Sequence, residues 1–226
     1  MNYCAITADI DKSRDIPERN VLQRKLLDIL KKANNAFKDH IVADFSITLG
    51  DEWQGVLKDI SQSYKVVSFF REGLHPISVS FGIGEGEIET DILPKTVEMD
   101  GQVFRRSRQA LQYAKEKSQH IFFVTNNALN DLLLNTTLQL LQILRESWTE
   151  RQYKKIMLYK QFQKEMLVAK KLNVSQADIN KALTAANGRA YLEAEQKLNQ
   201  YLTQLSLSAK ELCSQNKGQN SYNTRI

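Results

Sequence analysis

The stretch Thr48-Leu49-Gly50-Asp51-Glu52-Trp53-Gln54-Gly55 is the most informative part of this chain for its fold. It continues a segment of alternating apolar and polar residues that begins at Ala43. This period of two is typical of a strand with one buried face. Gly50 permits a tight turn into a short return strand. The stretch therefore predicts a β-hairpin with Asp51 at its tip.

A second carboxylate ends the apolar run near the start of the chain. The run Tyr3–Ala8 is typical of a buried strand, and Asp9 follows it directly. The helix-patterned segment Pro17–Phe37 then carries the chain to the hairpin. If the return strand lies antiparallel between the first two strands, Asp9 and Asp51 become neighbours at one end of the sheet.

Two neighbouring carboxylates repel each other unless a positive charge lies between them. Mg²⁺ is commonly held by one or two protein carboxylates together with phosphate oxygens and water. The pair therefore predicts a site for a divalent cation and a nucleoside triphosphate. The alternative is purely structural: Asp9 would cap a turn before Lys12, and Asp51 would be the polar residue of a Gly-Asp hairpin.

Three motifs resemble the landmarks of the nucleotidyl cyclase superfamily, which includes class III adenylyl and guanylyl cyclases and diguanylate cyclases. They are Ala8-Asp9-Ile10, Gly50-Asp51-Glu52-Trp53 and Val79–Gly86. Together with Asp100-Gly101-Gln102 and Glu146–Gln152, their order is most similar to the SatD family of bacterial proteins. The resemblance runs from Ala5 to about Tyr191.

The resemblance implies an α+β domain with a ferredoxin-like β-α-β-β-α-β sheet. It implies that the side chains of Asp9 and Asp51 and the backbone carbonyl of Ile10 bind Mg²⁺ or Mn²⁺. Gly50, Glu52 and Lys12 are the implied nucleotide contacts. Cyclase-like sites form between two subunits, so a homodimer is implied as well.

Several positions depart from the cyclase pattern. Ile47 or Thr48 stands where adenine-reading cyclases carry a lysine, and Leu49 replaces a glycine that diguanylate cyclases need. Phe104 replaces an asparagine that acts on the transition state, and Arg108 matches the catalytic arginine only with a one-residue slip. Phosphate binding is therefore better supported than cyclisation.

Gly82, Gly84 and Gly86 alternate along one predicted strand, so they do not form a phosphate loop. They favour close packing of a helix, or close approach of a ligand, on that face of the sheet.

The composition allows two modest domains. The chain has 226 residues and a net charge of +5, a surplus that is usually solvated surface. No segment approaches the ~20 apolar residues of a membrane span, and no signal peptide is apparent, so a cytoplasmic protein without membrane contact is expected. We expect a cyclase-like domain over 1–125, a connector helix over 126–147, a helix-turn-helix domain over 148–195, and a terminal helix with a disordered tail over 196–226.

The lysine-rich last third contains a second motif. Ala169, Asn173 and Ser175 are the small residue, the turn residue and the helix cap that a helix-turn-helix requires. Val174 and Ile179 are expected to point inward on either side of the cap. The second helix of such a motif enters the major groove of DNA.

The expected DNA contacts lie before the turn and at the start of the second helix. They are Lys170, Lys171, Ser175, Gln176, Ala177, Asn180 and Lys181. Gln and Asn can pair with adenine, whereas Lys reaches guanine or phosphate. The alternative is a helical hairpin that serves only dimerisation or packing.

These features favour a cytoplasmic DNA-binding regulator whose N-terminal domain dimerises and senses a nucleotide. One alternative is a nucleotidyl cyclase or related phosphoryl-transfer enzyme, with metal ions on Asp9 and Asp51. Another is an interaction module in which both sites are vestigial.

Overall fold

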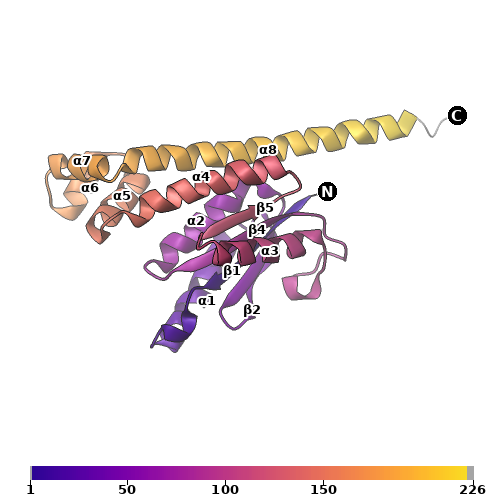
Figure 1. The fold of residues 1–226 in the computed structure, drawn as a ribbon, viewed down its shortest axis with the longest axis horizontal. Coiled ribbons are helices and arrows are strands. Elements are labelled where there is room, and N and C mark those ends of the chain that lie inside the picture. The colour runs from indigo at the N-terminus through magenta and orange to yellow at the C-terminus, as the bar shows by residue number, and fades with distance from the viewer. Residues whose placement is uncertain (1, 223–226) are drawn as a thin grey trace. The chain divides into compact units, whose positions relative to one another are not determined.

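The computed structural model describes residues 2–222, and it confirms the mixed α+β class. In chain order the elements are β1 (Tyr3–Ile10), α1 (Arg19–Ala36), β2 (Ile41–Leu49), β3 (Glu52–Leu57), α2 (Ser63–Leu74), β4 (Val79–Gly86), α3 (Gln102–Glu116), β5 (Ile121–Val124), α4 (Ala128–Glu146), α5 (Glu150–Phe162), α6 (Glu165–Leu172), α7 (Gln176–Ala185) and α8 (Gly188–Tyr222) (Figure 1).

The chain forms two compact units. The first contains the residues up to Asn135 and, from Asn199, the later part of α8, whereas the second is Thr136–Leu198. The two long helices α4 and α8 are therefore shared, and the division falls within them.

The sheet of the first unit has the strand order β2-β3-β1-β4-β5. The return strand β3 lies between β2 and β1 and is antiparallel to both, as the hairpin stretch predicts. Strand β4 is antiparallel to β1, and β5 is parallel to β4. Asp9 consequently lies opposite Glu52, one residue from the hairpin tip.

Helix α3 packs directly on the glycine face of β4. A Cβ atom at Gly82 would lie 2.1 Å from the backbone oxygen of Ser107, and one at Gly84 would lie 2.3 Å from the backbone nitrogen of the same residue. Only a residue without a side chain permits this approach. Of the two roles expected for the alternating glycines, helix packing is confirmed.

The opposite face of the sheet carries α1, α2 and an aromatic core. The Trp53 ring lies 5.7 Å from that of Phe70 on α2 and 6.0 Å from that of Phe81 on β4, measured between centroids. All three side chains are buried. Burying an aromatic side chain of this size contributes about 2 to 3 kcal/mol, so this cluster anchors the hairpin strand.

A buried chain of polar groups connects the hairpin to α3. The Gln54 amide donates to Thr7 Oγ1 over 2.7 Å, and the hydroxyls of Thr7 and Ser107 lie 2.9 Å apart. Ser107 donates its proton to the carbonyl of Phe104, so Thr7 is the donor to Ser107. Each of these three side chains has a hydrogen-bond partner, so burying them costs little free energy.

The turn after α6 and the cap of α7 have the conformations that the sequence predicts, and a further cap begins α5. Thr149 and Gln152 form a capping box at the start of α5. Asn173 adopts the left-handed conformation after α6 (φ 53°, ψ 49°), and the Ser175 side chain caps α7. Each of these devices satisfies helix-end groups with neighbours in the chain, so they are predictable locally.

Two local expectations are wrong. Val174 does not point inward, because the turn at Asn173 turns it outward and leaves it 41% exposed, whereas Ile179 is buried as expected. The polar tail from Ser214 is helical through Tyr222, because the helix-favouring segment before it propagates α8. The last four residues lie outside the described part of the chain.

Within residues 2–222, none of the helices has a stretch apolar enough to cross a lipid bilayer.

Gly82→Ala should lower the free energy of unfolding by about 3 kcal/mol or more, because the new Cβ collides with the backbone of α3. Gly86→Ala is the matched control on the same strand. Its Cβ would lie 2.9 Å from the backbone nitrogen of Val103, so a loss of about 1 kcal/mol is expected. Urea unfolding of both variants measures the difference, and equal losses would contradict the packing argument.

Stability should fall in acid through Asp59, which follows β3. Burial raises the pKa of this carboxyl, but hydrogen bonds from Lys210 and Ser61 outweigh it and lower the pKa from 3.8 to about 2. The ionised form therefore stabilises the fold fully above pH 3.8, and this contribution is lost as the pH falls through about 2.

Asp59→Asn should therefore lower the free energy of unfolding by about 1 to 2 kcal/mol at pH 5, after allowing for solvent screening, and by almost nothing at pH 2. Asp28→Asn, which removes an exposed pair with Lys32, should cost little at either pH. Denaturant titrations from pH 2 to 5 make the comparison.

Candidate functional site

A pocket of about 280 Å³ opens beside the carboxyl end of β1. Its walls come from three places: the end of β1 with the short 3-10 turn that follows it, the first turns of α1, and the tip of the β2–β3 hairpin. The lining residues are Ile10, Ser13, Arg19, Asn20, Leu22, Gln23, Leu26, Gly50 and Asp51. Polar groups and apolar side chains thus share one concave surface.

The pocket brings together three of the predicted residues. Ile10 ends β1, is 2% exposed and lines the pocket. Gly50 takes a positive φ of 61° at the turn, which places Asp51 at the hairpin tip. Arg19, Asn20 and Gln23 were not predicted, although they lie in the first turns of α1, within the segment that the sequence predicts to be helical.

Two predicted nucleotide contacts are not among the lining residues. The Glu52 carboxylate accepts a 2.9 Å hydrogen bond from the Thr48 hydroxyl, which fixes it within the hairpin. Lys12 is exposed and adopts the left-handed conformation (φ 51°) before the 3-10 turn. Its role in binding stays a prediction.

Asp9 lies on the other face of the sheet from the pocket. Thr7 and Asp9, two residues apart on β1, both bind side chains of α3, namely Ser107 and Lys115. The Asp9 carboxylate forms an ion pair with the Lys115 ammonium, and it is 21% exposed. A lysine therefore supplies the positive charge that the sequence assigned to a metal ion.

The residues present partly fit a divalent cation. Asp51 and Ile10 both line the pocket, and a carboxylate and a backbone carbonyl are ligand types that suit Mg²⁺ or Mn²⁺. No three His, Cys, Asp or Glu side chains within the described residues are grouped to hold a metal. Because Asp9 is engaged by Lys115, the shared cation site stays a prediction.

A polar cluster fixes the chain directly after Ile10. The Asp11 carboxylate accepts hydrogen bonds from the hydroxyls of Ser78 (2.6 Å) and Ser80 (2.7 Å), and lies 3.6 Å from His120 Nδ1. Burial raises the pKa of Asp11, but hydrogen bonds from His120 and the two serines outweigh it and lower the pKa. This cluster joins segments that are far apart in sequence, which is why sequence patterns did not reveal it.

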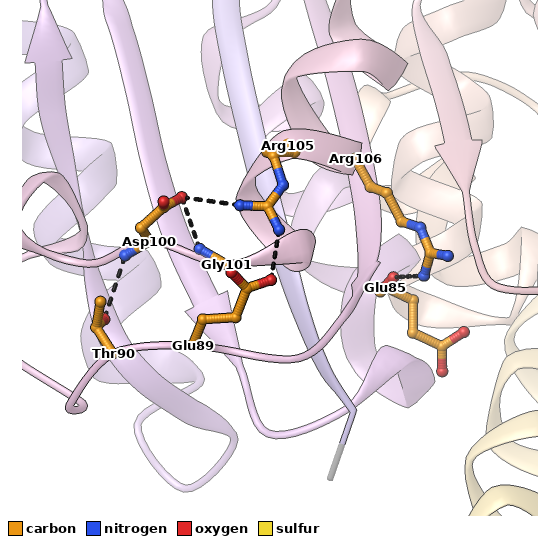
Figure 2. A network of polar contacts seen from close by, with 7 residues as sticks. All are labelled: Glu85, Glu89, Thr90, Asp100, Gly101, Arg105 and Arg106. Carbon is orange, nitrogen blue, oxygen red and sulfur yellow. Dashed lines mark hydrogen bonds and ion pairs between the residues drawn. The ribbon is translucent and has the colours of Figure 1, made fainter.

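The start of α3 is held by Asp100 (Figure 2). Its carboxylate accepts from the Gly101 N–H at 2.7 Å and from Arg105, which also pairs with Glu89. Arg106 donates to the Glu85 carbonyl over 2.6 Å. Asp100 and Gly101 therefore have a structural role at the start of α3.

Arg108, the predicted catalytic residue, lies on the exposed side of α3 and has no hydrogen bond or ion pair with the described residues. It precedes Lys115 by two helical turns. Phe104, which replaces the asparagine of the cyclase pattern, is 4% exposed and belongs to the core.

In the second unit, the predicted DNA-contacting residues are exposed, but some of their side chains already form hydrogen bonds within the protein. The side-chain amides of Gln176 and Asn180 donate to the Glu165 carboxylate at 3.3 and 3.4 Å. Arg189 forms an ion pair with the same carboxylate, and this hydrogen-bonded pair lowers the pKa of Glu165. Glu165 was not predicted, and it lies 11 residues before the first amide that it binds.

The remaining predicted contacts differ in their surroundings. Ser175 uses its hydroxyl to cap α7 by accepting from the Asp178 N–H, and Ala177 is exposed. The Lys171 ammonium lies 5.1 Å from the centroid of the Phe162 ring. Lys170 and Lys181 are exposed, so the lysines lie on the accessible surface of α6 and α7.

Comparison with known proteins identifies one family. The sequence model of the SatD family matches residues 3–202. A search of curated proteins finds no match.

Solved structures with a similar fold include three cyclase structures. A bacterial light-regulated adenylyl cyclase is 14% identical and matches over 54% of this chain and 74% of its own, with a TM-score of 0.41. The GGEEF domain of a diguanylate cyclase from Vibrio cholerae is 18% identical over 56% of this chain and 84% of its own, with a TM-score of 0.42. The adenylyl cyclase CyaB from P. aeruginosa is 15% identical over 48% and 70%, with a TM-score of 0.33.

Proposed function

The chain belongs to the SatD family, and we propose that it is a DNA-binding regulator whose first unit binds a nucleoside triphosphate with Mg²⁺ or Mn²⁺. The observation that carries the proposal is the pocket beside the end of β1. A concave surface with apolar walls and a few convergent polar groups is the usual form of a small-molecule site.

The pocket offers suitable chemistry for each part of a nucleotide. Arg19 provides a guanidinium for phosphate oxygens, and the amides of Asn20 and Gln23 can pair with the polar edge of a base. Leu22 and Leu26 provide an apolar wall for its ring. We assign the cation to the Asp51 carboxylate and the Ile10 carbonyl, where it would neutralise phosphate charge.

A phosphoryl-transfer enzyme is the second candidate. The exposed Arg108 favours it, because a guanidinium without a partner in the described residues is available to a phosphate. The buried Phe104 opposes it, because no polar side chain replaces the asparagine of the cyclase pattern. We therefore favour binding over cyclisation, and we interpret β1–β4 with α1 and α2 as a ferredoxin-like domain.

We assign DNA binding to the helix-turn-helix formed by α6, the Asn173 turn and α7. The support is local geometry: Asn173 and the Ser175 cap have the conformations that such a turn requires, and Lys170 and Lys181 are exposed. Gln176 and Asn180 lie at the start of α7, the part that contacts base edges in this motif. A homodimer would present two such helices to a two-fold symmetric site.

Asp51→Asn should abolish the rise in melting temperature that a nucleoside triphosphate produces with Mg²⁺ or Mn²⁺, because it removes the anionic cation ligand. Asp44→Asn, an exposed change on β2, is the matched control and should keep the full rise. Each ribonucleoside triphosphate is tested by thermal shift, with mass spectrometry for cyclic products. An unchanged rise in melting temperature in Asp51→Asn would contradict the proposed cation site. A cyclic product would favour the phosphoryl-transfer enzyme.

Asn180→Ala should lose discrimination at particular base pairs, by ~1 to 3 kcal/mol. Lys170→Ala should instead weaken binding to all DNA sequences alike. It should also reduce the slope of log affinity against log salt concentration by about one unit. Lys197→Ala, an exposed lysine on α8, is the control and should change neither. Anisotropy titrations at several salt concentrations, on DNA selected from genomic fragments, separate these patterns. If no fragment binds with or without nucleotide, α6 and α7 form only a packing module.

A further inference from the structure

One carboxylate in the second unit holds the two amide side chains that the proposed function assigns to DNA. Glu165, the first residue of α6, accepts from the Gln176 amide at 3.3 Å and from the Asn180 amide at 3.4 Å. Gln176 and Asn180 are four residues apart, so they lie on one face of α7. Arg189 of α8 binds the same carboxylate and holds it in place. Side chains from three helices therefore form one cluster.

The chemistry of this cluster fixes the direction of both amides. The hydrogen bond from Arg189 lowers the pKa of Glu165, so its carboxylate is ionised at neutral pH and can only accept hydrogen bonds. Each amide must therefore turn its NH₂ group toward Glu165 and its oxygen away. Gln176 and Asn180 are both exposed, and neither oxygen has a partner in the part of the chain that the structure describes. Because the carboxylate takes one hydrogen of each NH₂ group, each amide keeps one N–H donor and one free oxygen.

One donor and one acceptor on the same amide match adenine among the bases of DNA. In the major groove adenine presents an amino group at N6 and an acceptor at N7, and Asn or Gln pairs with both. Guanine and thymine present only acceptors for a hydrogen bond, which an amide free to turn would meet with its NH₂ group. Cytosine offers its N4 amino group alone, so it makes one hydrogen bond instead of two. An amide whose direction is fixed therefore selects adenine.

We propose that Glu165 sets the base specificity of α7 by holding Gln176 and Asn180 in the orientation that pairs with adenine. This inference rests on the proposed function, because it requires that α7 enters the major groove. Residues four apart rise about 6 Å along a helix and successive bases are about 3.4 Å apart, so the two adenines should lie within about two base steps. Glu165 is a positioning residue, since it acts through the amides. Arg189 compensates its charge, which reduces repulsion of the phosphates.

Modified bases test the pairing without any change to the protein. The DNA fragment that the full chain binds best is selected, and its adenines are replaced one at a time by purine, which lacks the N6 amino group, or by 7-deazaadenine, which lacks the N7 acceptor. Either replacement at a contacted adenine should weaken binding about tenfold in anisotropy titrations. The same replacements at the other adenines of the fragment are the control and should change little. If no replacement weakens binding, the amides do not read adenine and the proposal is overturned.

Glu165→Gln tests whether the carboxylate is what fixes the amides. The new side chain can donate as well as accept, so the amides of α7 become free to turn. The loss caused by purine should shrink from about tenfold to about twofold, and guanine should become tolerated at the same positions. Glu193→Gln removes an exposed carboxylate of equal charge from α8 and is the matched control. It should keep the full preference for adenine.

A second variant covers the case in which Glu165→Gln does not fold. Glu165→Asp keeps the negative charge for Arg189, but its side chain is one methylene shorter and cannot reach both amides. It should lose the preference for adenine while its melting temperature and the slope of log affinity against log salt concentration stay close to those of the unsubstituted protein. A merely structural role of Glu165 would instead change melting temperature and leave the base preference intact.

The outcomes separate this inference from the proposed function. If the unsubstituted protein binds its selected DNA and the Glu165 variants keep the full sensitivity to purine, the inference is overturned while DNA binding stands. If the unsubstituted protein binds no DNA with or without nucleotide, the proposed function fails and the inference fails with it. Loss of adenine preference in the Glu165 variants, with DNA binding retained, is the result that supports it.

Discussion

The direct contact between α3 and the glycine face of β4 is the constraint on which the first unit depends. At Gly82 and Gly84 the helix backbone takes the space that side chains would fill. This fixes the height and rotation of α3 over the sheet. Ser107 can then complete the buried chain from Gln54 through Thr7, and Lys115 can reach Asp9. A helix held farther from the sheet would make neither contact.

Successive side chains of β1 point to opposite faces of the sheet, so the residues of the candidate site lie on both faces. Asp9 belongs to the α3 face, whereas Ile10 lines the pocket on the α1 face with Asp51. The two carboxylates are therefore near each other in strand register but differ in environment. One is neutralised by a lysine, and the other lies in a pocket with an arginine. For this reason the proposed function assigns the cation to the pocket and not to a symmetric pair of metal sites.

In the second unit, one carboxylate changes what α7 presents to solvent. Glu165 is an acceptor only, so the amides of Gln176 and Asn180 must turn their NH₂ groups toward it. Their oxygens have no hydrogen-bond partner within the described residues. Arg189 stabilises the arrangement by binding the same carboxylate. The face thus presents acceptors, although the residue types alone suggest donors and acceptors equally.

Features that depend only on neighbours in the chain were predictable from the amino-acid sequence. The hairpin at Gly50, the caps at Thr149 and Ser175 and the left-handed turn at Asn173 need only residues within a few positions. The antiparallel pairing of β2 with β3 was predictable as well, whereas the positions of β4 and β5 in the sheet were not. The remaining contacts depend on the tertiary fold: Lys115 pairs with Asp9, two serines and a histidine surround Asp11, and Glu165 of α6 accepts from an amide of α7. These contacts join distant segments, and their partners are set by helix placement, which no local pattern encodes.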